Sequence, residues 1–199
     1  FLKKMDNNSI AFFNSNDNYP VSADTTLPFE QHRDLFYLTG INQEETILLL
    51  YKKNNESYKE IVFLTKPNDL LTHWEGERLS VNDTLSVSGI SSVYWLNELE
   101  KTIDELITEV KTLYINKNEH YRAKVETETR EERFNNWITG LHPKIKTKSS
   151  NSILQKLRSI KDPIEIDLIQ KACDITEKGF RRILGFVKPG VWEYEIEAE

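Results

Sequence analysis

Short apolar runs alternate with polar, turn-forming segments along most of the chain, a pattern typical of strands joined by turns and helices. The runs predict strands at residues 9–14, 45–51, 58–65, 93–96 and 113–116. In the second run, apolar residues occupy every position from Ile47 to Leu50, which favours a strand covered on both faces. The sequence therefore predicts an α/β fold, with a sheet of about five or six strands between helices.

Helical spacing appears between the later strands. After a cap at Asn97, apolar residues of segment 98–111 recur every three or four positions, which predicts a helix between two strands. Such a unit normally forms a right-handed crossover between parallel strands. Residues 124–140 predict a charged helix with a narrow buried edge that ends at Gly140. A short strand at Ile145 and a helix over 152–160 follow.

Segment 29–41 (FEQHRDLFYLTGI) packs aromatic, polar and charged residues together without clean periodicity. We interpret its second half as a helical turn that leads into a loop, with Phe36, Tyr37 and Leu38 in the core. Gly40 would supply a positive φ before the next strand.

The last 43 residues, 157–199, predict the beginning of a second structural unit. Asp162 can cap a helix whose first residue is Pro163, and Glu165 can bond back to the cap amide. A long apolar stripe follows at Ile164, Leu168, Ala172, Ile175, Phe180, Ile183, Leu184 and Val187. Residues 188–190 (KPG) would end this helix, and residues 191–199 begin another. The unit looks incomplete.

Charge and composition restrict the classes of partner and the compartment that we expect for this protein. The formal net charge is −6 and both signs are interleaved, which argues against nucleic-acid or anionic-membrane binding. No apolar run approaches the ~18 residues that span a bilayer. The single cysteine, Cys173, lies in the helical stripe, where we expect a small core residue. A single cysteine allows no intramolecular disulfide, so we expect a soluble protein in the cytoplasm.

Motifs for common chemistries are missing from the sequence. It contains no GxSxG, GxxxxGK[ST] or GxGxxG pattern, and its four histidines form no HExxH pair. The best local cluster is 73–78 (HWEGER), which is more typical of an exposed polar loop than of a metal site. Acidic pairs such as Glu44 with Glu45 and Glu131 with Glu132 are expected to lie on solvated faces.

Three segments together resemble the N-terminal part of the Xaa-Pro aminopeptidases (aminopeptidase P), in the creatinase/prolidase "pita-bread" family of metallopeptidases. The first, 27–41, resembles PFRQDSDFYYLTGF, and its matching residues are Pro28, Phe29, Gln31, Asp34, Tyr37, Leu38, Thr39 and Gly40. The second, 74–79, resembles W-x-G-x-R-x through Trp74, Gly76 and Arg78. The third, 157–199, resembles LRxIKSPxEIxLMRxAxxIT followed by PGxxEYxIEAE. Glu30 departs from the pattern by replacing an arginine, and His32 and Arg33 replace Asp-Ser.

The resemblance implies a creatinase-type N-terminal domain and the start of a catalytic domain. By family order, the ligands of two divalent ions, often manganese, follow residue 199, so we expect no metal ion on this chain and no activity from it alone. Such an ion pair activates a bridging water and polarises the carbonyl of an Xaa-Pro bond. The implied domain limits are 1–148 for the N-terminal domain, 149–162 for a linker, and 163–199 for the incomplete catalytic domain.

The resemblance also implies partners and roles. In the whole protein, this region would pack against the protein's own catalytic domain and would form a homo-oligomer. The substrates would be peptides with proline at the second position. Packing or intersubunit roles fall to Phe29, Asp34, Tyr37, Thr39, Gly40, Trp74, Gly76 and Arg78. Two alternatives stay open: a freestanding binding or oligomerisation module without chemistry, and the N-terminal part of a prolidase or creatinase.

Overall fold

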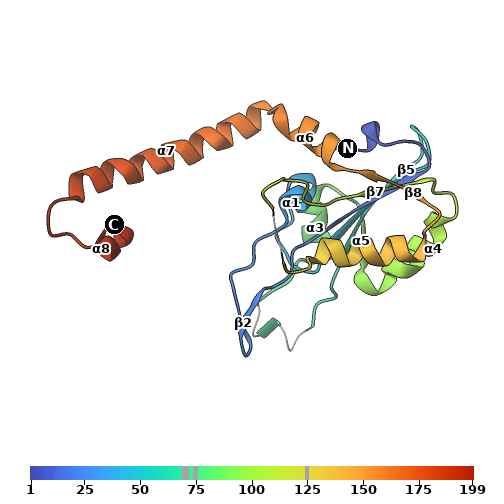
Figure 1. The fold of residues 1–199 in the computed structure, drawn as a ribbon, viewed down its shortest axis with the longest axis horizontal. Helices are drawn as coiled ribbons and strands as arrows, with labels where there is room; N and C mark the ends of the chain where they lie inside the picture. Colours follow the sequence, from blue (N-terminus) through green and yellow to red (C-terminus); the bar gives the residue numbers. More distant parts are fainter. Residues whose placement is uncertain (69–71, 74–75, 124–125) are drawn as a thin grey trace. The chain divides into compact units, whose positions relative to one another are not determined.

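A six-stranded mixed sheet forms the centre of the first part of the chain (Figure 1). The computed structural model describes residues 1–68, 72–73, 76–123 and 126–199. In spatial order the strands are β6 (Ser92–Trp95), β5 (Tyr58–Leu64), β4 (Ile47–Lys52), β1 (Ser9–Asn14), β7 (Thr112–Ile115) and β8 (Lys146–Ser149). The predicted α/β fold and its sheet are confirmed.

The strand order differs from a simple crossover. Strand β4 pairs antiparallel with both β1 and β5, whereas the pairs β5–β6, β1–β7 and β7–β8 are parallel. Strands β6 and β7, joined through the predicted helix, therefore run parallel but are separated by β5, β4 and β1. The reason is burial: every residue of β1 and β4 is buried, which suits central strands, while β6 is only partly buried and lies at an edge.

Helices cover both faces of the sheet. Helices α4 (Leu99–Ile107) and α5 (Arg130–Leu141) contribute Leu99, Ile103, Leu106 and Ile138 to one apolar cluster, which also contains Phe12, Leu49 and Phe63 of the strands. Helix α1 (Arg33–Thr39) contacts β1 and β4, and its fully buried Leu35 lies outside that cluster. Since side chains alternate along a strand, α1 packs on the opposite face.

The boundaries of α5 differ from the prediction of 124–140. Thr129 caps the helix, because its Oγ1 accepts from the Glu132 N–H at 3.2 Å while its own N–H donates to Glu132 Oε2 at 3.0 Å. The helix therefore begins at Arg130, and positions 124–125 lie outside the described residues. Gly140 does not end it: the helix continues to Leu141, and His142 precedes Pro143, which cannot continue it.

Several short elements have no apolar pattern and were not predicted. They are η1 (Leu2–Lys4), the β2–β3 hairpin (Pro20–Ser22 and Thr25–Thr26), α3 (Val81–Ser88) and η2 (Leu96–Glu98). Helix α3 buries only Thr84 and is defined by its ends, with a capping box between Ser80 and Asp83 and a left-handed Gly89. Local capping therefore stabilises an element that has almost no apolar stripe.

The chain divides into two compact units, Phe1–Gln155 and Lys156–Glu199. Helix α6 (Asn151–Ser159) crosses this division, and α7 (Pro163–Phe186) and α8 (Glu193–Ala198) follow it. At the start of α7, the Asp162 N–H donates to Glu165 Oε2 at 2.8 Å, as the predicted capping box requires. Neither α7 nor α8 buries a residue. Cys173 is therefore exposed, and the prediction that it is a core residue was wrong.

No helix in the described ranges is long and apolar enough to cross a membrane.

Candidate functional site

Helix α1 positions the predicted site residues of segment 29–41. His32 caps it, since Nδ1 accepts from the Asp34 N–H at 3.3 Å, so the departure at this position preserves a cap. Thr39 Oγ1 donates to the Leu35 carbonyl at 2.8 Å and accepts from the Ile41 N–H at 3.1 Å. Gly40 ends the helix with φ of 71°, as predicted. These bonds determine where α1 begins and ends.

The aromatic residues of α1 do not lie in the core as expected. Phe36 is 46% exposed and Tyr37 37% exposed, while Leu35 and Thr39 are buried. The physical reason is the helical period: Leu35 and Thr39 are four residues apart and share the inward face. Phe29, before the helix, is half-buried. Phe36 and Tyr37 thus lie on the outward face of this helix.

Gly40→Ala is expected to destabilise the chain by about 1 kcal/mol, because alanine disfavours φ of 71° and its Cβ would lie 3.4 Å from Val87 Cγ1. Gly140→Ala is the matched control. It lies within α5 with no atom within 4 Å of the added Cβ, and we expect it to stabilise by about 0.5 kcal/mol. Urea denaturation of both variants measures the difference. Equal effects of the two substitutions would contradict the role of the left-handed cap.

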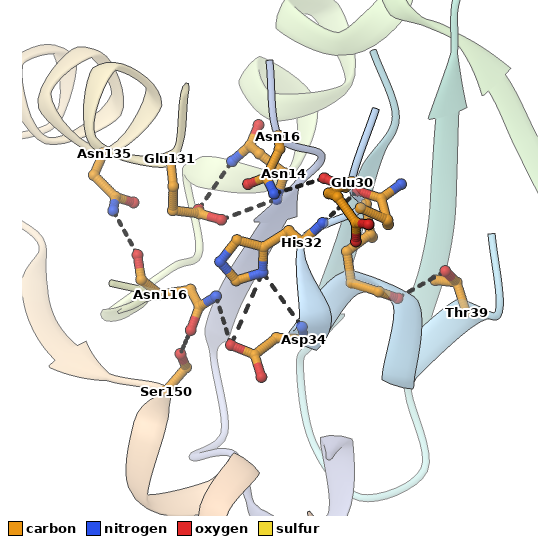
Figure 2. Close-up of polar contacts among 12 residues, drawn as sticks. Asn14, Asn16, Glu30, His32, Asp34, Thr39, Asn116, Glu131, Asn135 and Ser150 are labelled. Carbon is orange, nitrogen blue, oxygen red and sulfur yellow. Dashed lines mark hydrogen bonds and ion pairs between the residues drawn. The ribbon is translucent and has the colours of Figure 1, made fainter. Parts of the chain in front are cut away.

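A buried carboxylate joins β1 to α5 (Figure 2). Glu131 is 5% exposed; its Oε2 accepts from the Asn14 N–H at 3.1 Å and its Oε1 from Asn14 Nδ2 at 3.0 Å. Burial raises the pKa of Glu131 to about 7, against the opposing effect of the two bonds from Asn14. The expectation that the Glu131–Glu132 pair lies on a solvated face was therefore wrong for Glu131.

Asn116, next to Glu131, connects several elements in what we call the Asn116 network. Its Nδ2 donates to Asp34 Oδ2 at 3.2 Å, and its Oδ1 accepts from Ser150 Oγ at 2.7 Å (Figure 2). Its backbone carbonyl accepts from Asn135 Nδ2 at 2.7 Å. The predicted site residue Asp34 thus links α1 to the end of β7, and its negative charge also raises the pKa of Glu131.

Arg78 holds the second acidic pair. Its Nη2 lies 2.9 Å from Glu44 Oε1 and its Nη1 lies 3.3 Å from Glu45 Oε2. Thr65 Oγ1 also donates to Glu45 Oε2, at 2.6 Å. The Arg78 side chain is only 14% exposed and that of Glu44 24%, so the expected solvated face was wrong for Glu44. The Glu45 side chain is ion-paired too, but it is 45% exposed and so keeps contact with solvent as expected. The guanidinium fork joins the loop before β4 to the loop before α3.

A pocket of about 320 Å³ lies beside Arg78, and we call it the Gln43 pocket. It brings together two predicted site residues, Gly40 and Arg78, and its other lining residues are Ile41, Asn42, Gln43, Glu44, Glu77, Leu79 and Val87. Gly76, with φ of 87°, is exposed nearby in sequence. Trp74 lies outside the described residues. Asp34 and Thr39 do not line this pocket: Asp34 is bonded to Asn116, and Thr39 is bonded within and just after α1.

The residues present do not fit the metal ions that the resemblance implies. Within the described part of the chain, no three His, Cys, Asp or Glu side chains come close enough to hold an ion. In the 73–78 cluster, Trp74 and Glu75 lie outside that part. No catalytic step is therefore assigned to these residues.

Sequence reasoning missed Asn14, Gln43, Asn116 and Glu131. A signal existed for Glu131, because it precedes Phe134, Asn135 and Ile138 by three, four and seven residues, the spacing of one helix face. Thr129 and Glu132 also form an S/T-x-x-E capping box, which assigns Glu132 to the cap. The asparagines and Gln43 carry no comparable pattern.

The sequence is similar to those of known aminopeptidases. Residues 1–114 match the model for the aminopeptidase P N-terminal domain. An Xaa-Pro aminopeptidase of Haemophilus influenzae is 30% identical over 176 residues, which cover 88% of this chain and 38% of that protein. One from Escherichia coli is 25% identical over 183 residues, which cover 89% of this chain and 41% of that protein. The chain thus spans about two fifths of these relatives.

Solved structures share the fold. One assigned as an aminopeptidase P from Bacillus anthracis has a TM-score of 0.89 at 27% identity and covers 98% of this chain and 46% of its own. Zinc-substituted E. coli aminopeptidase P in complex with product has a TM-score of 0.81 at 20% identity, over 99% and 45% of the two chains. With more than half of its residues matched by the model of the N-terminal domain, this chain belongs to the aminopeptidase P family.

Proposed function

We propose that this chain is the non-catalytic N-terminal region of a metal-dependent Xaa-Pro aminopeptidase, which removes the N-terminal residue that precedes proline. The observation that carries the proposal is the family match over residues 1–114. The 30% identity to the H. influenzae Xaa-Pro aminopeptidase supports the choice of reaction. Proline lacks the amide hydrogen that other peptidases bind, so this bond requires a dedicated site.

The catalytic residues would lie in sequence that follows this chain in the full-length protein. The chain covers only 38% of the H. influenzae relative, which leaves room for a further domain. We place two divalent ions there, most simply manganese; the zinc-substituted form of the E. coli enzyme supports a metal site in such relatives. In this proposal the present residues shape and assemble the enzyme.

The proposed domain limits are 1–148, 149–162 and 163–199, with the third part opening the catalytic domain. The exposed apolar side chains of α7, among them Leu168, Ile175 and Phe180, support this division, because such a stripe normally packs against further structure. We further propose a cytoplasmic homo-oligomer. The exposure of Phe36 and Tyr37 supports contacts through the N-terminal domain, since aromatic residues are enriched at interfaces.

The test compares the 199-residue chain with the full-length protein encoded by the extended reading frame. After reconstitution with Mn²⁺, the full-length protein should cleave Xaa-Pro-Yaa tripeptides, and a chelator should abolish the activity. The 199-residue chain should give no cleavage above the buffer rate. Mass spectrometry of the released residue measures both.

Two results would contradict this proposal. If the reading frame after residue 199 encoded no Asp, His and Glu residues in a metal-ligand pattern, the protein would be a binding module without catalytic activity. Cleavage of Xaa-Pro dipeptides but not of tripeptides would assign the protein to the prolidases instead.

Trp74→Ala in the full-length protein tests the assembly role. If Trp74 contributes to assembly or to the active site, the variant should show a changed oligomeric state or a changed kcat/KM for Xaa-Pro peptides.

A further inference from the structure

Helix α5 is held on the sheet in two different ways along its length. At its first turn, Glu131 accepts from the backbone N–H of Asn14 at 3.1 Å and from Asn14 Nδ2 at 3.0 Å (Figure 2). Further along the helix, Phe134, Trp137 and Ile138 pack in or against the apolar core cluster. The first turn therefore depends on a buried polar contact with the end of β1, whereas the later turns depend on apolar burial.

The contact between Glu131 and Asn14 joins two chain segments that line a pocket of about 360 Å³, which we call the Tyr19 pocket. Its lining includes Asn16, Asp17 and Tyr19, which follow Asn14, and residues 127–130, which precede Glu131. Loss of the Glu131–Asn14 contact would therefore free one lining segment of the pocket to move relative to the other.

Two further polar contacts connect the same parts of the chain, and both are exposed. Tyr19 Oη lies 3.4 Å from Thr127 Oγ1, and Arg133 Nη2 lies 2.7 Å from Asp17 Oδ1. Exposed polar contacts contribute little to stability, because water competes for both partners. Of the three contacts, the buried one made by Glu131 should therefore contribute most to holding the segments together.

The surroundings of Glu131 suit a neutral carboxyl better than an ionised one. The side chain is 5% exposed, and no cation among the described residues is ion-paired with it. The charge that acts on it is negative: Asp34 of α1 raises the pKa of Glu131, and Asp34 Oδ2 lies 4.0 Å from Nδ1 of the α1 cap His32. The ionisable neighbours on its own helix turn are Arg130, Glu132 and Arg133. Ionisation of Glu131 thus places an unpaired charge in a buried position, which is costly.

We propose that Glu131 and Asn14 form a pH-dependent latch, which holds the start of α5 on the end of β1 while Glu131 is protonated and opens more often once Glu131 is ionised. Opening lets water solvate the carboxylate and also Asn14 Oδ1, which is buried without a partner among the described residues. It separates the segments that line the Tyr19 pocket and leaves the later turns of α5 packed, so the opening is local. The latch goes beyond the peptidase function proposed above and does not rest on it.

The direction of the pH effect follows from two pKa values. In the closed form, burial raises the pKa of Glu131 to about 7, whereas a hydrated carboxyl has its ordinary pKa of 4.5. The closed form therefore binds the proton more tightly than the open form, and opening becomes easier as pH rises from 4.5 to about 7. Between pH 5 and pH 8, the equilibrium constant for opening should rise about 70-fold.

Hydrogen exchange of the ¹⁵N-labelled 199-residue chain, followed by NMR, tests the latch. Two amides report on opening: that of Asn14, which donates to Glu131 Oε2, and that of Arg133, which donates to the Thr129 carbonyl. Their protection factors, corrected for intrinsic exchange, should fall about 70-fold from pH 5 to pH 8. Low urea should not change them, because a local opening exposes little surface. The NOE between the Tyr19 ring and the Thr127 methyl group should weaken over the same pH range.

Glu131→Gln should remove this pH dependence, because its neutral side chain imitates the protonated carboxyl at every pH. Protection of the two reporter amides should then differ by less than about threefold between pH 5 and pH 8. Glu132→Gln is the matched control: it is exposed on the same turn, its oxygen can still accept the capping bond from the Thr129 N–H, and the 70-fold fall should persist. His32 is common to all three proteins, so its own titration cancels in the comparison.

Three results would overturn the proposal. The first is protection of Asn14 and Arg133 that does not change with pH. The second is a fall that the amides of β4 share with the same dependence on urea, since Glu131 would then be exposed only by unfolding of the whole chain. The third is wild-type pH dependence in Glu131→Gln, which would assign the titration to another group. If Glu131→Gln did not fold, the comparison of the two reporter amides with those of β4 in the wild type would decide alone.

Discussion

Replacing Glu131 with glutamine is expected to stabilise the chain at pH 8 by on the order of 3 kcal/mol and at pH 5 by less than about 1 kcal/mol. The pKa of Glu131 in the folded chain is about 7, against an ordinary value of 4.5, because the carboxyl is buried between β1 and α5. The folded state therefore binds this proton more tightly than the unfolded state does.

The sign of the pH dependence follows from this order of pKa values. Well below pH 4.5 both states carry the proton, and Glu131 adds no pH dependence. As pH rises from 4.5 to about 7, the unfolded chain releases the proton first, so the free energy of unfolding falls. At 1.36 kcal/mol per pH unit, the difference corresponds to on the order of 3 kcal/mol, lost by pH 8.

Asn14 explains why glutamine should fit. Its Nδ2 and N–H both donate to the carboxylate, while its buried Oδ1 has no partner among the described residues. Rotation of the Asn14 amide would turn Oδ1 toward Glu131, where it can accept from a protonated carboxyl or from the NH₂ group of glutamine. Glu131→Gln therefore imitates the protonated state at every pH.

Urea denaturation of the wild type and of Glu131→Gln between pH 4.5 and 8.5 measures the effect. The control is Glu132→Gln, an exposed neighbour on the same helix turn, because a glutamine oxygen can still accept the capping bond from the Thr129 N–H and the wild-type slope should be kept. Because the histidines are common to all three proteins, the difference between wild type and variant isolates Glu131. A difference that is constant with pH, or one that favours the wild type at pH 8, is incompatible with a buried carboxyl of raised pKa.

Arg78→Ala is expected to destabilise the chain by roughly 2 kcal/mol. The substitution removes charge-assisted bonds to Glu44 and Glu45 and leaves two adjacent carboxylates unpaired, and such bonds contribute about 1.5–3 kcal/mol each when sheltered. Glu45 also has a positive φ of 53°, a strained conformation that its bonds to Arg78 and Thr65 help to maintain.

Arg33→Ala is the control, since Arg33 forms an exposed pair with Glu30 at 3.2 Å that should contribute less than about 0.5 kcal/mol. Arg78→Lys should recover less than half of the loss, because an ammonium cannot bond two carboxylates through a planar fork. Thermal and urea denaturation of the three variants give the values. If Arg78→Ala and Arg33→Ala lowered the free energy of unfolding equally, the Arg78 ion pairs would contribute no more to stability than an exposed surface pair does.

Much of the fold could be predicted from local pattern. The apolar run at 45–51 became the fully buried β4, and the Asp162–Glu165 cap marks the start of α7. These features depend on residues that are neighbours in sequence, so capping and periodicity are sufficient to find them. Helix α3 was missed because its stability comes from its two ends and not from a stripe.

The candidate site was harder to predict. Asp34, Gly40 and Arg78 were found through resemblance, but their partners were not. Asp34 meets Asn116 82 positions away, and Glu131 meets Asn14 117 positions away. Nothing in the local pattern distinguishes a paired carboxylate from a solvated one, since the difference lies in which strand or loop faces it.

The sequence by itself determined the α/β class, most strands, the capped α7 and the family resemblance, because each of these depends on residues close together in the chain. Only the tertiary structure decided the strand order, the burial of Glu131 and the convergence of Gln43, Glu44 and Arg78 on one pocket. The physical reason is that burial and pairing depend on contacts between distant segments. On the exposed face of α5 a glutamate is a solvated charge. On the buried face, where Glu131 lies, burial raises the pKa of the carboxyl to about 7.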